Sequence, residues 1–237
     1  NKVVTANIDI YERYVQIQTK SSIDAKTIKV LNPKEVVFEG GRELELDAVS
    51  EVPRYYVCNA YGVCGIYSAP GTAVKEAYDT SGIVTNDRGV TVWLKGNRVS
   101  RNQIMAIKEE SVTEQKNSLA VCLDNILRHA GITRNTEYDL AQGKTATTIL
   151  SENMTGVQVL DLSGCTLDAV LYYVNQDIPV LAILEDGEAV LVTGFNEFNV
   201  VIMEPATGKL YKKGMNDATA WFAENGNHFI TYMRIEN

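Results

Sequence analysis

The sequence predicts an α+β protein in two parts, and three observations indicate this class. Residues 1–103 contain short β-branched runs separated by turn residues, which is typical of strands. Residues 118–131 carry apolar side chains at helical spacing. Residues 179–235 alternate short apolar runs with turn residues, as in an antiparallel sheet. We therefore predict a strand-rich α+β unit over residues 1–103, followed by a domain over residues 104–237 in which a buried helix packs on an antiparallel sheet.

The composition narrows the class of partner. The chain has 237 residues, of which 45% are hydrophobic and 22% charged, as in ordinary globular proteins. Its net charge of −8 and pI of about 4.9 argue against nucleic acid as a partner, because a phosphate-binding surface needs clustered Lys and Arg. No apolar run approaches the roughly 20 residues of a membrane span. The chain starts at Asn1 without a Met or a signal-type segment, and we expect a processed or excised product of a bacterial exported protein, located at the cell surface or outside the cell.

The cysteines and histidines do not suggest a metal site. Cys58 and Cys64 bracket the loop NAYGV, and the sequence leaves two alternatives open: a disulfide if the protein is exported, or two free thiols beside a tight turn. A zinc site needs about four Cys or His ligands at suitable spacing, and the two histidines, His129 and His228, are far away in sequence. We expect no metal and no other cofactor.

The first part of the chain alternates strands and one helix. Its early strands are separated by Asn32-Pro33 and Gly40-Gly41. A helix follows with small and apolar residues on one face and Gly82 just past its end. The sequence NDRG then joins two apolar strands as a hairpin. Paired carboxylates, a phosphate loop and histidine are all missing from this unit, so its role stays open.

The helix over residues 118–131 is predicted to be buried along one side. Asn117 or Ser118 can cap its start and Gly131 its end. Cys122 lies within the apolar stripe, so we expect it to be a small buried hydrophobe and not a nucleophile. His129 lies on the opposite side near the helix end, where it favours the negative end of the helix dipole, and we expect no catalytic role for it. The stripe consists of Leu119, Cys122, Leu123, Ile126, Leu127 and Ala130.

A second helix and a meander of strands complete the prediction. Residues 166–176 form a helix with an apolar stripe that ends before Pro179. Turn residues then divide the chain into strands at Asp186-Gly187, at Asn196-Glu197 and at residues 206–208. A short helix, DATAWFAENG, precedes the last strand, HFITYMRI.

This order of elements resembles the papain-like cysteine peptidases of the bacteriocin-processing type, the double-glycine leader peptidases, over about residues 115–235. SLAVCLDNILRHAGI looks like the family's nucleophile helix, and QGKTATTILSE resembles its Gly-Thr segment. DLSGCTLDAVLYYVNQDIPVLAIL looks like its second helix and following strand. EAVLVTGFNEFNVVIMEPATGKL resembles its histidine-containing hairpin. The resemblance implies a papain-like fold.

The resemblance also locates the former catalytic triad and shows that it has changed. The nucleophile position falls on Ser118, the general-base histidine on Glu188, and the orienting aspartate on Glu204. A serine hydroxyl reacts only when a base removes its proton, and a carboxylate is too weak a base for an alcohol. We therefore expect no catalytic residue and an inactive, pseudo-peptidase domain that binds a peptide or an envelope partner in the former cleft.

Two other classes of function remain as alternatives: an active peptidase or transferase with an atypical nucleophile, and a purely structural surface module. If the strands around Asn196-Glu197 pair as a hairpin, Glu188 and Glu204 lie at one end of it, about 5–8 Å apart. Ser118, Glu188 and Glu204 are then the candidate ligand-binding residues, in a pocket for cations, amines or peptides. Alternatively the two glutamates are independent residues on a solvated rim. The sequence leaves the ligand and the oligomeric state open.

Overall fold

The computed structural model divides the chain into two compact units, Asn1–Pro53 and Arg54–Asn237. It describes residues 28–32, 35–38, 42–45, 53–62, 64–96, 101, 104, 107 and 117–235. In the first unit three short strands form an antiparallel sheet in the order β1-β2-β3, with bounds Ile28–Asn32, Glu35–Phe38 and Arg42–Glu45. Residues 54–96 belong to the second compact unit, together with residues 117–235. The domain boundary predicted between residues 103 and 104 stays a prediction.

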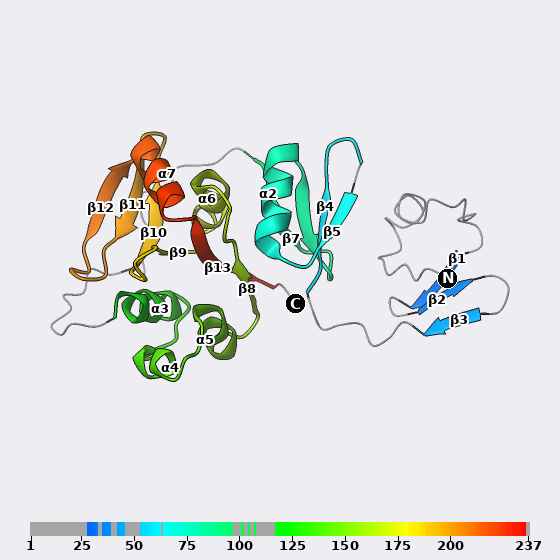
Figure 1. The fold of residues 1–237 in the computed structure, drawn as a ribbon, viewed down its shortest axis with the longest axis horizontal. Coiled ribbons are helices and arrows are strands. Elements are labelled where there is room, and N and C mark those ends of the chain that lie inside the picture. The colour runs from blue at the N-terminus through cyan, green and yellow to red at the C-terminus, as the bar shows by residue number, and fades with distance from the viewer. Residues whose placement is uncertain are drawn as a thin grey trace. The chain divides into compact units, whose positions relative to one another are not determined.

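The second unit begins with a four-stranded antiparallel sheet covered by one helix (Figure 1). Helix α2 starts at a proline, which suits the first helical position, and the N–H of Gly82 bonds to the carbonyl of Ala77 at its end. The predicted hairpin is confirmed, because residues 83–85 pair with residues 91–94 as antiparallel strands. In its turn the side chain of Asn86 accepts bonds from the N–H groups of Arg88 and Val90. The sheet order is β5-β4-β6-β7, and the elements are β4 (Tyr55–Cys58), β5 (Cys64–Tyr67), α2 (Pro70–Thr80), β6 (Ile83–Asn86) and β7 (Thr91–Leu94).

The two N-terminal cysteines form a disulfide. Cys58 and Cys64 lie opposite each other in the β4–β5 pair, and a bond joins their sulfur atoms. Of the two alternatives that the sequence left open, the structure has the bonded one. Cys122 and Cys165 are free and buried.

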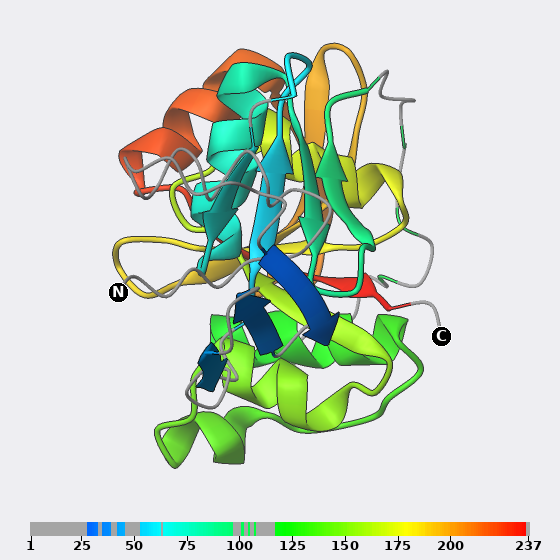
Figure 2. The same ribbon diagram turned by 90° about the vertical axis from the view of Figure 1, so that its right-hand side faces the viewer.

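The rest of the unit is a six-stranded antiparallel sheet with helices on it, so the predicted α+β class and the helix packed on an antiparallel sheet are confirmed (Figures 1 and 2). The sheet order is β12-β11-β10-β9-β13-β8. The helices are α3 (Ser118–His129), α4 (Glu137–Ala141), α5 (Ala146–Asn153), α6 (Leu167–Asn175) and α7 (Met215–Glu224). The strands are β8 (Val157–Asp161), β9 (Val180–Ile183), β10 (Ala189–Phe195), β11 (Asn199–Met203), β12 (Leu210–Gly214) and β13 (His228–Arg234). Among the described residues, no helix has the length and apolar character needed to cross a bilayer.

Helix α3 forms where the apolar stripe predicted it. The side chain of Asn117 accepts bonds from the N–H groups of Leu119 and Ala120, and thereby caps the helix. At the other end the N–H of Ile132 reaches back to the carbonyl of Leu127, with Gly131 at a φ of +83°. The helix packs against β10, β9 and α5. The prediction of burial along one side is wrong, because residues 120–127 are all buried, whereas Ala130 of the predicted stripe is exposed. Cys122 is fully buried, as predicted.

The sequence places His129 on the side of α3 opposite the apolar stripe, yet its side chain is buried. Its side chain is 6% exposed, and Nε2 lies 2.6 Å from the backbone carbonyl of Asp177. A carbonyl only accepts, so Nε2 carries the hydrogen in this contact. The end of α3 is covered by the turn that follows α6, which a helical periodicity argument has no means of detecting.

The four-stranded sheet and the six-stranded sheet share one hydrophobic core. The indole Nε1 of Trp93 donates to the carbonyl of Ala169 at 3.0 Å, and the hydroxyl of Tyr173 donates to the carbonyl of Val92 at 3.1 Å. The side chain of Gln158 on β8 bonds both Asn86 and Tyr55. These buried polar contacts fix residues 55–94 against β8 and α6.

Candidate functional site

Ser118 lies at the first turn of α3 and bonds directly to the sheet. Its Oγ accepts a hydrogen bond from the N–H of Ala189 at 3.0 Å. Ala189 is the first residue of β10 and follows Glu188 in the chain. The structure therefore brings Ser118 next to the residue that follows Glu188.

The hydrogen bond from Ala189 to Ser118 forms beyond the point where the β10–β11 pairing ends. On one side β10 pairs with β9, where Ala189 is opposite Ile183. On the other side the pairing with β11 ends at Leu191 and Met203, and continuing that register places Pro205 opposite Ala189. Proline has no N–H to donate to the carbonyl of Ala189, and the β10–β11 pairing ends at Leu191. The N–H of Ala189 is bonded to the hydroxyl of Ser118.

Glu188 ends a tight turn between β9 and β10. Its N–H bonds to the side chain of Asp186, and its carbonyl accepts the N–H of Leu184. The side chain is exposed. Burial, and after it the negative charge of Glu188, raises the pKa of the Cys122 thiol well above its usual value. The carboxylate thus lies near the first turns of α3, and Cys122 stays a neutral thiol without nucleophilic character.

Glu204 lies just past the end of β11, diagonal to Glu188 when the β10–β11 register is continued. Its backbone closes a turn, because its N–H bonds to the carbonyl of Lys209 and its carbonyl accepts the N–H of Gly208. Its carboxylate accepts a bond from the hydroxyl of Thr207 at 2.8 Å. The side chain is exposed and is fixed within its own turn. Among the described residues, no Lys or Arg forms an ion pair with Glu188 or Glu204.

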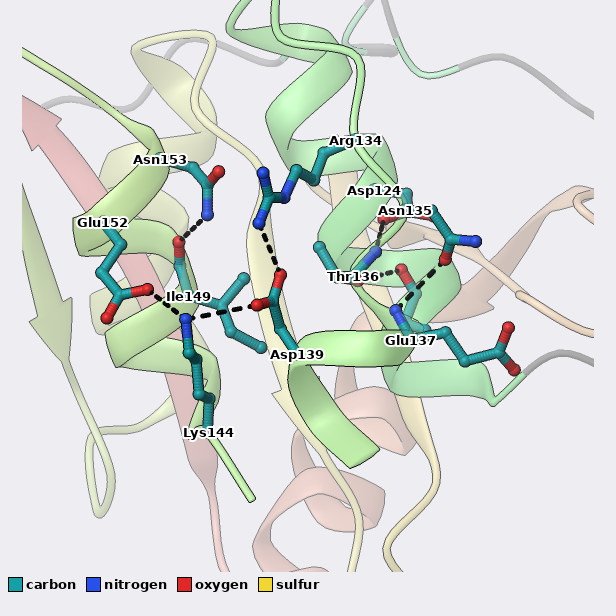
Figure 3. A network of polar contacts seen from close by, with 11 residues as sticks. Asp124, Arg134, Asn135, Thr136, Glu137, Asp139, Lys144, Ile149, Glu152 and Asn153 are labelled. Carbon is teal, nitrogen blue, oxygen red and sulfur yellow. Dashed lines mark hydrogen bonds and ion pairs between the residues drawn. The ribbon is translucent and has the colours of Figure 1, made fainter. Parts of the chain in front are cut away.

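A separate polar network positions the helices beside α3 (Figure 3). The buried side chain of Asp124 accepts the N–H of Thr136 at 2.9 Å, and the hydroxyl of Thr136 bonds back to the carbonyl of Ala120. Asp139 binds two cations, Arg134 at 3.0 Å and Lys144 at 3.2 Å. The segment between α3 and α5 is therefore fixed by contacts that do not involve the candidate site.

Neither histidine reaches Ser118. His129 is at the far end of α3, bonded to Asp177. His228, Ile183 and Ala189 lie in one row across β13, β9 and β10, which separates His228 from Ala189 by two strand spacings, about 10 Å. Ser118 bonds to the edge of β10 that faces away from β13. An imidazole base for the Ser118 hydroxyl is thus missing from the described residues.

The chain was compared with protein families, curated proteins and solved structures. No family model matches the sequence, and no curated protein matches it. A search of solved structures finds the crystal structure of a Bacillus anthracis protein whose description names a C39-like peptidase. The two chains are 12% identical, with a TM-score of 0.47, and the match covers 60% of this chain and 100% of the other.

The described residues of the site present mainly hydrogen-bond acceptors. Ser118 Oγ accepts from the backbone, the N-terminal N–H groups of α3 bond to Asn117, and the carboxylates of Glu188 and Glu204 are exposed. Such an arrangement can bind donors, above all cations. The sequence did not predict the contact between Ser118 and Ala189. Pro205 was the available signal, because it predicts where the β10–β11 ladder ends.

Proposed function

We propose that the region over residues 117–235 is a pseudo-peptidase: a peptidase-like domain without catalysis that binds a peptide or an envelope partner in the former substrate cleft. The observation that supports this best is the bond from Ala189 N–H to Ser118 Oγ. It gives the hydroxyl a structural task, connecting α3 to β10, at the position where the family's nucleophile would be free to attack.

The electrostatics of the site support the same proposal. A peptidase of this type needs an imidazole to activate its nucleophile and to return the proton to the leaving group. Here a glutamate takes that position. Burial, and after it the charge of this glutamate, raises the pKa of the nearby Cys122 thiol, whereas catalysis by cysteine requires a lowered one. With a second carboxylate diagonal to it, the hairpin base favours basic peptide segments or peptide amino ends.

Export of the protein is part of this proposal. The Cys58–Cys64 disulfide supports it, because such bonds persist in oxidising compartments and are rare in the cytosol. We accordingly propose an extracellular or cell-surface location in a bacterium.

The first experiment separates binding from catalysis. The wild-type chain is incubated with a peptide library, cleavage is followed by mass spectrometry, and thiols are labelled with a reactive reagent. We expect no cleavage, and no labelling of the buried Cys122 in the folded protein. Cleavage by the wild type that is lost in Ser118→Ala would contradict the inactive assignment.

The second experiment tests the acidic hairpin base. Binding of cationic and neutral peptides of matched length is measured for the wild type, Glu188→Gln and Glu204→Gln. Glu197→Gln is the matched control, because Glu197 is an exposed glutamate in the turn at the opposite end of the same hairpin. We expect the cationic peptides to bind more weakly to the first two variants only, by about tenfold. Equal affinities in all four proteins would assign the two glutamates to a solvated rim and favour the structural-module alternative.

A further inference from the structure

A small cavity lies where the four-stranded sheet meets α6, and it shares no residue with the site at Ser118. It is bounded by the end of β7, the last turns of α2 and one face of α6, and has a volume of about 200 Å³. Its lining is unusual in holding three aromatic side chains and two opposite charges: Tyr78, Trp93, Tyr172, Lys95 and Asp168. Asp168 and Tyr172 are four residues apart and so lie on one face of α6.

The three rings form a rigid box. Trp93 is 2% exposed, and the hydrogen bond from its indole to the carbonyl of Ala169 fixes its orientation. The centroids of Tyr78 and Tyr172 both lie 6.1 Å from that of Trp93, with interplanar angles of 56° and 53°. Trp93 thus forms a floor with two inclined walls, and the hydroxyl of Tyr173, bonded to Val92, fixes the same strand from behind.

One wall of the box already carries a cation. The ammonium of Lys95 lies 5.1 Å from the centroid of Tyr78, within the range of a cation–π contact. Its two hydrogen bonds, to the carbonyl of Tyr78 at 3.5 Å and to Ser81 Oγ at 3.4 Å, are longer than the roughly 2.7–3.2 Å of good ones. The side chain is exposed and lies two residues past Trp93. Lys95 is therefore a cation of the protein itself that lines the cavity and makes only weak contacts.

We propose that this cavity binds a compact organic cation with an alkylated ammonium head, a quaternary or methylated amine, and that Lys95 leaves the Tyr78 ring when the ligand enters. Aromatic faces attract cations most strongly when desolvation is cheap, and an alkylated ammonium gives up less hydration than the ammonium of lysine. The carboxylate of Asp168 supplies the opposite charge in the wall. The volume is below the roughly 300 Å³ at which pockets for drug-sized ligands begin, so it fits a head group and not a larger molecule.

Removing the charge of Lys95 distinguishes a cationic ligand from an anionic one, because the two cases predict opposite changes in affinity. If the ligand is a cation, Lys95 competes with it and its removal strengthens binding. If the ligand is an anion, Lys95 is its partner and its removal abolishes binding. Lys95→Met is safe to interpret because the side chain is exposed and makes only weak contacts in the fold.

The test is a calorimetric titration of the full chain with choline, tetramethylammonium and 3,3-dimethylbutan-1-ol, a neutral analogue of choline in which carbon replaces nitrogen. We expect choline and tetramethylammonium to bind and the neutral analogue to bind at least about tenfold more weakly. Asp168→Asn should weaken choline binding about tenfold, and Lys95→Met should strengthen it several-fold. Fluorescence of Trp93 in a Trp221→Phe background gives a second readout, because the chain has 2 tryptophans.

The control variant is Lys213→Met. Lys213 lies over the ring of Trp221 at 5.0 Å and so forms a second cation–π pair outside the cavity. We expect this variant to bind choline like the wild type. Equal binding of choline and its neutral analogue, loss of binding in Lys95→Met, or no binding of any probe would each overturn the proposal. None of these results bears on the peptide-binding experiments at Glu188.

Discussion

Among the described residues, acidic side chains form ion pairs in the segment of α4 and α5 but not at the base of the β10–β11 hairpin. In the helical segment Asp139, 6% exposed, binds Arg134 and Lys144, and Lys144 also binds Glu152 at 2.6 Å (Figure 3). At the base of the β10–β11 hairpin, Glu188 and Glu204 are exposed and lack an ion-pair partner among the described residues. The first group has a partner for every charge, and the second keeps its charge available.

The difference distinguishes carboxylates that stabilise the fold from carboxylates that remain able to bind a ligand. A carboxylate that is satisfied within the fold contributes to stability and has little left for a ligand, whereas an unpaired one costs a little stability and retains its capacity to bind. The chain has 30 acidic and 22 basic residues, so some carboxylates have no ion-pair partner. Basic residues pair with the acids that fix α4 and α5, and none forms an ion pair with Glu188 or Glu204 in the part that the structure describes.

The largest expected effect is at Asp124, which connects α3 to the segment before α4. In Asp124→Ala the buried N–H of Thr136 loses its acceptor, and we expect the free energy of unfolding to fall by about 1–3 kcal/mol. Asp124→Asn keeps an acceptor oxygen and should recover most of the loss. Urea denaturation followed by circular dichroism measures both. If the two variants were equally unstable, the charge of Asp124, and not its hydrogen bond, would be what the helical segment requires.

Ser118 gives the next effect, because it belongs to the candidate site but makes a structural bond. Ser118→Ala leaves the N–H of the buried Ala189 without its acceptor, and we expect a loss of about 1 kcal/mol. Ser118→Thr keeps the hydroxyl and is the matched control in the same denaturation assay. A stability of Ser118→Ala equal to that of the wild type would remove the structural role, and with it the main support for an inactive site.

The sequence was most informative where local patterns decide the structure. The apolar stripe predicted α3, and the turn residues predicted the meander. It did not predict α4, or the bond between Asp124 and Thr136, because that contact joins residues 12 apart through a loop without periodicity. The packing of Trp93 on Ala169 was missed for a similar reason, since a contact over 76 residues leaves no local signal.

Asp139 should give a smaller effect that depends on pH. The hydrogen bond from Arg134, then that from Lys144, holds the pKa of the Asp139 carboxyl below its usual value, so its contribution to stability is present above about pH 4 and is lost as the pH falls through the lowered pKa. The difference in unfolding midpoint between wild type and Asp139→Asn should therefore be constant near neutral pH and vanish in acid. Its partners Arg134 and Lys144 are 46% and 35% exposed, so high salt should reduce the difference. A difference that persists at pH 2 would show that the effect does not come from the ion pairs.

The smallest expected effect on stability is at the hairpin base, and it completes the comparison. Glu188 uses its backbone, not its carboxylate, in the bonds that close the β9–β10 turn. Glu188→Gln keeps the shape of the side chain and removes a charge that has no ion-pair partner among the described residues. We expect the free energy of unfolding to change by less than about 0.5 kcal/mol, with any change a gain, because one of two neighbouring negative charges is removed. Chemical denaturation of the variant beside Asp139→Asn measures this directly. A loss as large as that of Asp139→Asn would mean that Glu188 is a structural residue like the acids of the helical segment, and the distinction between the two regions would fail.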